Sequence, residues 1–122
     1  MDKTMDERIR YVRQDHIFKV DLSGRTDRSK LAEISEALRG CVKANLISDK
    51  TIKFLFDFRG VQWDSEETHM KAREISARYL QDVLRGSNYF SAILNDPVDG
   101  QSFENECLFT EEQNAVDWLR RK

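Results

Sequence analysis

The feature that most constrains the fold is a run of large apolar residues in the middle of the chain. It comprises Ile52, Phe54, Leu55, Phe56 and Phe58, interrupted only by Lys53 and Asp57. A half-exposed strand alternates apolar and polar residues, whereas a nearly continuous apolar run is typical of a strand covered on both faces. The run therefore predicts a central β-strand with other elements packed on each side of the sheet.

Two strands and a helix are predicted before this run. The strands lie within residues 7–25 and join near Gln14 and Asp15, and the second alternates apolar Phe18 and Val20 with polar neighbours. The helix has an apolar stripe at helical spacing, formed by Leu31, Ile34, Leu38 and Val42.

The ends of that helix are predicted from its capping residues and its glycine. Thr26 or Asp27 is expected to cap the start, because either side-chain oxygen can accept from the amides of the first turn. Gly40 is expected to end or bend the helix, since Gly costs about 1 kcal/mol relative to Ala. The helix is therefore predicted to end between Arg39 and Asn45.

The second half of the chain continues the alternation. A helix is predicted from about Glu66 to Leu84, closed by Gly86, with Ala72, Ile75, Tyr79 and Val83 as its apolar stripe. Strands are predicted over residues 89–96, before Pro97, and over 106–110. Between them lies a polar loop whose one apolar anchor is Phe103.

The last helix is expected to begin with a capping box. In this motif Thr110 would cap a first-turn amide while Gln113 reaches back to the cap residue. The predicted order is ββαβαββα, an α/β fold with a mixed, partly parallel sheet of about five strands and three or more helices. A chain of 122 residues is expected to form one domain over residues 1–122, with residues 1–7 as a candidate disordered tail.

Charge and composition narrow the function classes. Twenty Lys and Arg residues oppose twenty-two Asp and Glu residues, which gives no electrostatic footprint for nucleic acid or an anionic membrane. No apolar run has transmembrane length, and the start is too charged for a signal peptide. Cys41 and Cys107 are interpreted as reduced, buried thiols of a cytoplasmic protein, with a disulfide as the less favoured alternative.

Motifs for catalysis and cofactors are absent from the sequence. The only histidines, His16 and His69, belong to no zinc-binding pattern, and no phosphate loop, dinucleotide fingerprint or nucleophile elbow occurs. No catalytic residue, cofactor or metal is therefore assigned. A metal bound by the cluster Asp64, Glu66, Glu67 and His69 is less favoured than helix capping. In the capping interpretation Asp64 or Ser65 is the N-cap, and Glu67 completes a box from Asp64.

Aromatic and basic residues leave further alternatives. Trp63 follows the central strand and is expected either to line a pocket or to pack over the strand end. Trp118 is expected to lie in the core. Arg8, Arg10 and Arg13 are interpreted as a solvated strand face in preference to a basic recognition patch.

The segment FLFDFRGVQWDSEE resembles the anti-anti-sigma-factor-like (STAS, or SpoIIAA-like) domains. In that family an apolar strand ends in Asp-Leu-Ser, and Asp-Ser-Ser/Thr-Gly follows at a helix start. Here Asp57-Phe58-Arg59 and Asp64-Ser65 take those places. The end of the chain, Leu108 to Arg121, is similar to the uncharacterised bacterial SpoIIAA-like branch, which is akin in fold to lipid-binding CRAL-TRIO domains.

The resemblance implies a non-enzymatic regulatory or binding module. In regulatory members the helix-start Ser is phosphorylated by a partner kinase, but here the spacing is one residue shorter and Glu66-Glu67 replaces a small residue and Gly. Capping is therefore the favoured role of Ser65 over phosphorylation.

Three functional hypotheses follow. In the first, Asp57, Gly60, Trp63, Asp64 and Ser65 bind a protein partner, at the place where open α/β sheets bind ligands. The second is an apolar pocket for a small molecule or lipid that uses Trp63, Phe90 and Phe103. The third is acid–base catalysis by Asp57 or Asp64 with His69. Self-association into a homo-oligomer is compatible with all three.

Overall fold

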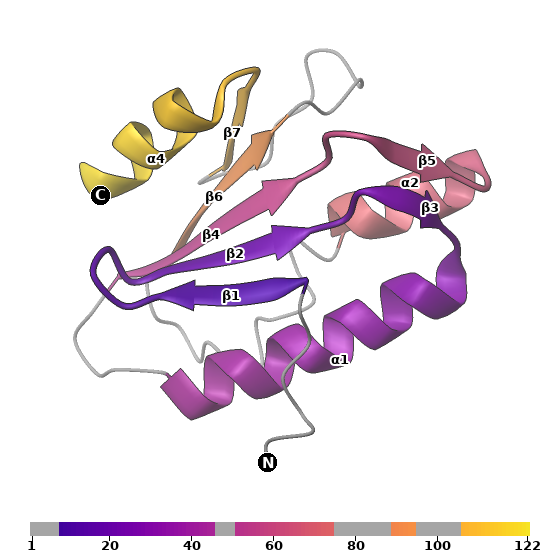
Figure 1. The fold of residues 1–122 in the computed structure, drawn as a ribbon, viewed down its shortest axis with the longest axis horizontal. Coiled ribbons are helices and arrows are strands. Elements are labelled where there is room, and N and C mark those ends of the chain that lie inside the picture. Colours follow the sequence, from indigo (N-terminus) through magenta and orange to yellow (C-terminus); the bar gives the residue numbers. More distant parts are fainter. Residues whose placement is uncertain (1–7, 46–50, 75–88, 95–105) are drawn as a thin grey trace.

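The computed structural model describes residues 8–45, 51–74, 89–94 and 106–122 of the chain. These residues form an α/β structure in which helices cover both faces of a five-stranded mixed sheet (Figure 1). The predicted α/β class and mixed sheet are confirmed.

The sheet has the strand order β1-β2-β4-β6-β7. Its strands are β1 (Ile9–Val12), β2 (Ile17–Asp21), β4 (Ile52–Asp57), β6 (Tyr89–Leu94) and β7 (Glu106–Phe109). β1 runs antiparallel to β2, and all other neighbours in this sheet are parallel. β4 lies in the middle, paired with β2 and β6, so the prediction of a central strand is confirmed.

Two short strands continue β2 and β4 beyond their carboxyl ends. β3 (Gly24–Thr26) and β5 (Val61–Trp63) pair in parallel as a separate two-stranded sheet. The predicted order lacked both, and the observed order of described elements is βββαββαββα. Three residues that include glycine or polar side chains give no strand pattern. The strands form because the two chain segments stay adjacent, so the Gly24 amide donates to the Gly60 carbonyl at 2.9 Å.

Helices α1 (Arg28–Asn45) and α2 (Glu66–Glu74) contribute to one face of the sheet, and α4 (Glu112–Arg120) covers the other (Figure 1). Asp27, and not Thr26, caps α1, because its Oδ1 accepts the Lys30 amide at 2.8 Å. The Thr26 hydroxyl donates to the Leu22 carbonyl instead. α1 passes through Gly40 and reaches the limit of its predicted range.

Each face of the sheet has its own hydrophobic cluster. The cluster under α1 contains Phe18, Val20, Phe54, Phe56 and Ile93, together with the α1 stripe Leu31, Ile34, Leu38 and Val42. The cluster under α4 contains Ile17, Leu55, Ala92, Leu94, Ala115, Val116 and Leu119. Adjacent residues of β2, β4 and β6 enter opposite clusters, which explains the nearly continuous apolar run of β4.

The capping box predicted for the last helix is wrong. The N-cap of α4 is Glu111, whose backbone is extended (φ −124°, ψ 133°), and no side chain caps the helix. Gln113 donates to Asp117 at 2.9 Å instead of reaching back. The helix begins one residue later than the box requires, so Thr110 lies outside the capping position.

Some predicted features fall outside the described residues. They are the second helix beyond Glu74 with Ile75, Tyr79, Val83 and Gly86, the loop with Pro97 and Phe103, and the tail 1–7. Cys41 on α1 and Cys107 on β7 are both free and half-buried. Within the described ranges, no helix has both the length and the apolar character needed to cross a bilayer.

Candidate functional site

Part of the sheet face on the α4 side carries charged side chains. Residues paired across strands point to the same side, so the registers place Arg10 beside Lys19 and Asp21 beside Asp57. Farther along this face, on β6, the corresponding residues are apolar and α4 covers them. The sheet face is therefore divided into an apolar part under α4 and a charged part over β1, β2 and the end of β4.

A cleft of about 220 Å³ lies in the charged part, and we call it the charged cleft. It is lined by Arg8, Arg10, Lys19, Val20, Asp21, Leu55, Asp57 and Glu112. Asp21 and Asp57 are the last residues of the adjacent parallel strands β2 and β4. The charged cleft thus lies at the carboxyl edge of the sheet, where open α/β sheets bind ligands.

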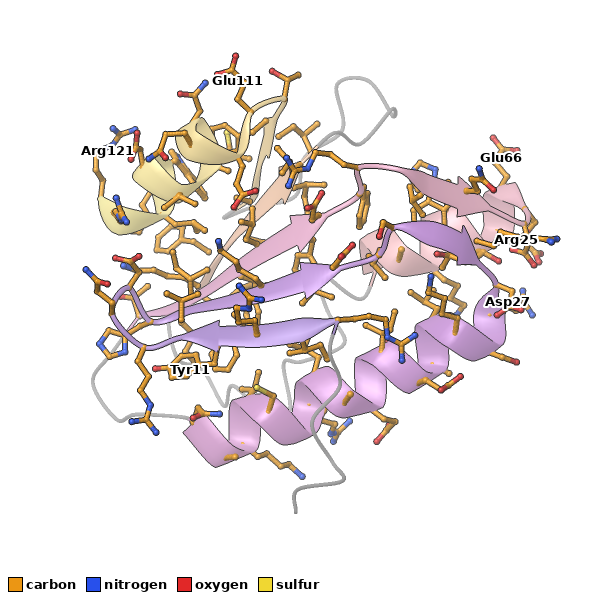
Figure 2. The ribbon with its side chains drawn as sticks, viewed as in Figure 1. Tyr11, Arg25, Asp27, Glu66, Glu111 and Arg121 are labelled. Carbon is orange, nitrogen blue, oxygen red and sulfur yellow. The ribbon has the colours of Figure 1, made fainter. Side chains whose placement is uncertain are left out.

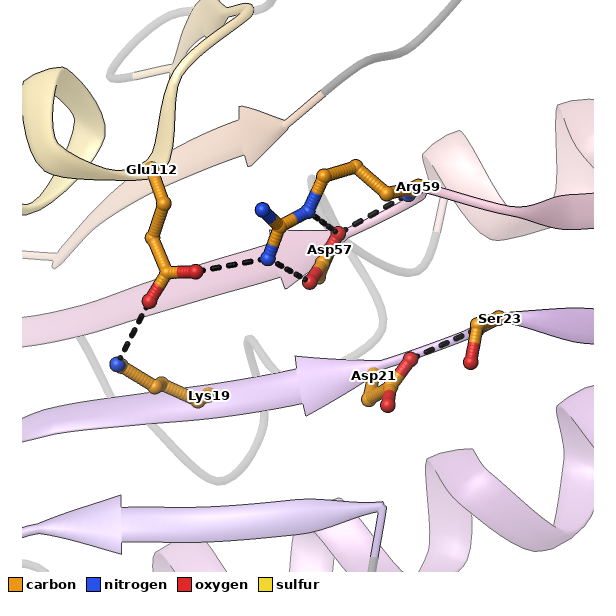
Figure 3. Close-up of polar contacts among 6 residues, drawn as sticks. All are labelled: Lys19, Asp21, Ser23, Asp57, Arg59 and Glu112. Atoms are coloured by element: carbon orange, nitrogen blue, oxygen red, sulfur yellow. Dashed lines mark hydrogen bonds and ion pairs between the residues drawn. The ribbon is translucent and has the colours of Figure 1, made fainter.

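A chain of ion pairs connects α4 to the two strands beneath it (Figure 3). The Glu112 carboxylate accepts from Lys19 Nζ at 3.1 Å and from Arg59 Nη2 at 2.7 Å. Arg59 also donates two hydrogen bonds to the Asp57 carboxylate, from Nε to Oδ1 at 3.0 Å and from Nη2 to Oδ2 at 2.8 Å. These four side chains, which we call the Glu112 network, carry two charges of each sign.

The network shifts the acidity of its members. The hydrogen bond from Lys19 lowers the pKa of the Glu112 carboxyl; partial desolvation opposes this shift, and Arg59 adds to it. The hydrogen bond to Asp57 raises the pKa of the Arg59 guanidinium. Both shifts favour the charged forms of Glu112 and Arg59.

β2 and β4 end in the same local construction. In each, the terminal aspartate, Asp21 or Asp57, accepts from the backbone amide two residues later, at 2.8 and 3.0 Å respectively (Figure 3). A glycine with positive φ follows each, 88° at Gly24 and 72° at Gly60, a conformation that side chains disfavour. The segments VDLSG and FDFRG share this pattern, which is a sequence signal for the carboxyl edge that was missed.

The structure separates the predicted binding residues. Asp57 lies in the charged cleft, whereas Gly60, Trp63, Asp64 and Ser65 follow it along β5 to the start of α2. Figure 2 shows the far end of that path, where Arg25 of β3 and Glu66 of α2 lie away from Glu111 and α4. The predicted set therefore spans two surfaces, the charged cleft and the β5–α2 end.

Trp63 packs against aromatic neighbours. Its ring stacks on His69 with centroids 4.9 Å apart and meets Phe58 edge-on at 5.4 Å. Within the described part of the chain its buried indole N–H has no hydrogen-bond partner. Phe90, the second wall of the hypothetical apolar pocket, packs against the opposite cluster under α4. Trp63 and Phe90 thus do not face one common pocket, and Phe103 lies outside the described residues.

Ser65 caps α2, which confirms one of the two predicted capping residues. Its Oγ accepts the Thr68 amide at 3.2 Å and hydrogen-bonds the Thr68 hydroxyl at 3.1 Å. The predicted box from Asp64 to Glu67 is wrong, because the Asp64 amide, which Glu67 would have to accept, donates to the Thr26 carbonyl at 3.1 Å. Glu67 pairs with Arg28 at 2.7 Å instead. Across the residues that the structure describes, no three His, Cys, Asp or Glu side chains are grouped to hold a metal.

Lys19, Arg59 and Glu112 were not predicted as site residues. Lys19 belongs to the polar face of an alternating strand, and its partner Glu112 comes 93 positions later in the chain. Arg10 is exposed, consistent with the predicted solvated face, but it also lines the charged cleft. No local pattern reveals such contacts, because they depend on how α4 packs.

Comparison of the chain with protein-family models, with curated proteins and with solved structures found no match in any of the three.

Proposed function

We propose that the protein is a non-enzymatic regulatory or binding module of the SpoIIAA-like (STAS) type that contacts a protein partner through the charged cleft. The observation that carries the proposal is the position of this cleft at the carboxyl ends of β2 and β4. In open α/β sheets this edge is where ligands bind, since loops leave it and helices do not cover it.

The charges of the cleft favour a polar partner surface over an apolar ligand. Six of its eight lining residues are ionisable, with cations and carboxylates side by side. Complementary charge patterns provide partner specificity and steer encounter more than they add affinity. A lipid would remove water from these charged groups without supplying new polar contacts, which is costly.

The Glu112 network supports the proposal because it holds part of the surface in place. Arg59 is fixed by two carboxylates, Asp57 and Glu112, and Lys19 is fixed by one. Side chains that are already ordered lose less conformational entropy when a partner binds. The cleft therefore presents a defined charge pattern before contact.

The proposal is tested with charge-swapped variants of equal net charge. The cleft variant is Arg10→Glu with Asp21→Lys, and the matched variant at the β5–α2 end is Arg25→Glu with Asp64→Lys. All four positions are exposed, so both variants are expected to fold. Each protein is immobilised, and the proteins retained from an extract of the source cells are quantified by mass spectrometry.

We expect at least one protein that the wild type retains at a stoichiometric level to be lost with the cleft variant and kept with the matched variant. Loss with the matched variant alone would move the contact surface to the β5–α2 end and contradict the proposal. Native mass spectrometry of the purified wild type gives its oligomeric mass. A stoichiometric apolar ligand in that spectrum would favour the pocket alternative.

A further inference from the structure

We infer that the charged cleft binds an anionic group, a carboxylate or a phosphate, with Arg10 as its principal contact. The inference rests on the proposed function, because it names the chemical group of the partner that the cleft receives. It concerns β1 and β2, which lie outside the segment 57–65 that the sequence indicated.

Cations gather on the β1–β2 side of the cleft. Arg8 and Arg10 are two residues apart on one chain segment and line the same cleft, and Lys19 lies directly across from Arg10 in the antiparallel register. Lys19 is paired with Glu112 at 3.1 Å, whereas Arg10 has no carboxylate partner among the described residues. Arg10 is therefore the cation of this opposed pair that an incoming anion would contact.

The carboxylates of the cleft already accept hydrogen bonds from other groups of the protein. Glu112 uses one oxygen for Lys19 and the other for Arg59, and Asp57 uses both oxygens for Arg59. Asp21 accepts a backbone amide. Among the described residues, Arg10 forms no ion pair or side-chain hydrogen bond. Its guanidinium thus remains available to a ligand.

The size of the cleft limits what can enter. Its volume of about 220 Å³ is below the ~300–1,000 Å³ of pockets that enclose a drug-sized ligand. That space accommodates a phosphate, or the carboxylate end of a side chain, but not a whole cofactor or a lipid chain.

The chemistry of arginine matches such a group. A guanidinium presents parallel N–H donors that bind the two oxygens of a carboxylate or phosphate at once. Arg10 is exposed and lines the cleft, so its guanidinium can present these donors to a carboxylate or phosphate that enters.

The test is an NMR titration of the full chain, labelled with ¹⁵N, at constant ionic strength. The probes are inorganic phosphate, which represents a phosphorylated side chain, and acetate, which represents an Asp or Glu side chain. Wild type is compared with Arg10→Gln and with the control Arg25→Gln, which removes an equal charge from exposed β3. Arg10→Lys keeps the charge but removes the planar fork.

We expect at least one probe to cause saturable shifts in the backbone amides of the cleft-lining residues. Arg10→Gln should weaken this binding about tenfold or more, since a charge-assisted contact is lost, and Arg25→Gln should leave it unchanged. Arg10→Lys should fall between wild type and Arg10→Gln. The probe that binds more tightly identifies phosphate or carboxylate as the preferred group.

The inference is overturned if neither probe shows saturable shifts, or if Arg25→Gln weakens them as much as Arg10→Gln does. These results are distinct from failure of the proposed function. If no anion binds but the cleft variant still loses the protein partner, the anion site is wrong and the binding module stands. If an anion binds through Arg10 but no partner depends on the cleft, the proposed function is wrong.

Discussion

At the scale of single residues, Glu112 is the side chain that links the elements of the candidate site. Its two oxygens reach Lys19 of β2 and Arg59 after β4, so one carboxylate joins α4 to two strands. The Glu112 side chain is 38% exposed, and such ion pairs contribute only about 0.2–1 kcal/mol each because water screens them. The main effect of Glu112 is therefore to position the two cations.

Glu112→Gln is expected to lower the free energy of unfolding at pH 7 by about 0.5–1 kcal/mol. The folded-state pKa of Glu112 lies below its unfolded value, so between the two values the unfolded chain binds more protons. The stabilisation is fully present above the unfolded pKa, near 4.3, and is lost as pH falls through the folded pKa. Urea unfolding of both proteins from pH 7 to pH 3 measures this difference.

The control is Glu111→Gln, which removes the same charge one residue earlier, where the side chain makes no capping bond. Its difference from wild type should lack the Glu112 pH dependence. A gap between wild type and Glu112→Gln that stays constant down to pH 3 would show that the network does not lower the pKa of Glu112.

At the scale of elements, α4 is attached by its side chains at both ends and left uncapped at its start. Near its end, Arg120 binds Asp15 in the β1–β2 turn through Nε at 3.1 Å and Nη2 at 3.2 Å. At its start, Glu112 joins the network while the N-cap Glu111 offers no side-chain bond. Contacts with the sheet therefore place this helix, and local capping does not.

Thr110→Ala is expected to change stability by less than about 0.5 kcal/mol, although a capping Thr would cost about 1 kcal/mol on removal. Glu111→Asp is expected to stabilise the protein by about 0.5–1 kcal/mol, because the shorter carboxylate can accept from the first-turn amides. Thermal and urea unfolding measure both. If Thr110→Ala lowered the free energy of unfolding by about 1 kcal/mol and Glu111→Asp did not raise it, Thr110 would be the capping residue after all.

At the scale of the whole molecule, two clusters share one sheet. Alternate residues of β2, β4 and β6 enter the cluster under α1 or the cluster under α4, so neither cluster exists without the strands of the other. Trp63 packs on the first and Trp118 on the second. Each tryptophan therefore reports on one face of the sheet.

We expect the two faces to unfold in one transition. In Trp63→Phe only Trp118 reports, and in Trp118→Phe only Trp63 reports, because the chain has two tryptophans. Within each variant, the urea midpoints from tryptophan fluorescence and from far-ultraviolet circular dichroism should coincide. A Trp118 midpoint clearly below the dichroism midpoint would mean that α4 and its cluster separate first.

The sequence by itself determined the elements whose pattern is local. Three local patterns predicted which faces of their elements are buried: the apolar run of β4, the alternation in β2 and the stripe of α1. They could do so because burial repeats along the sequence with the period of the strand or helix. Asp57 was also selected from the sequence as a candidate site residue, since it ends an apolar strand. The capping of α1 by Asp27 was one of two local alternatives.

Only the tertiary structure decided the strands β3 and β5, the start of α4 and the composition of the charged cleft. Each depends on segments that are distant in sequence: Gly24 meets Gly60, and Glu112 meets Lys19 across 93 positions. At the start of α4 the local rule for a capping box did not hold, and Glu112 in the first turn binds Lys19 and Arg59 instead. Local propensities contribute about 1 kcal/mol per residue or less, so long-range contacts readily override them.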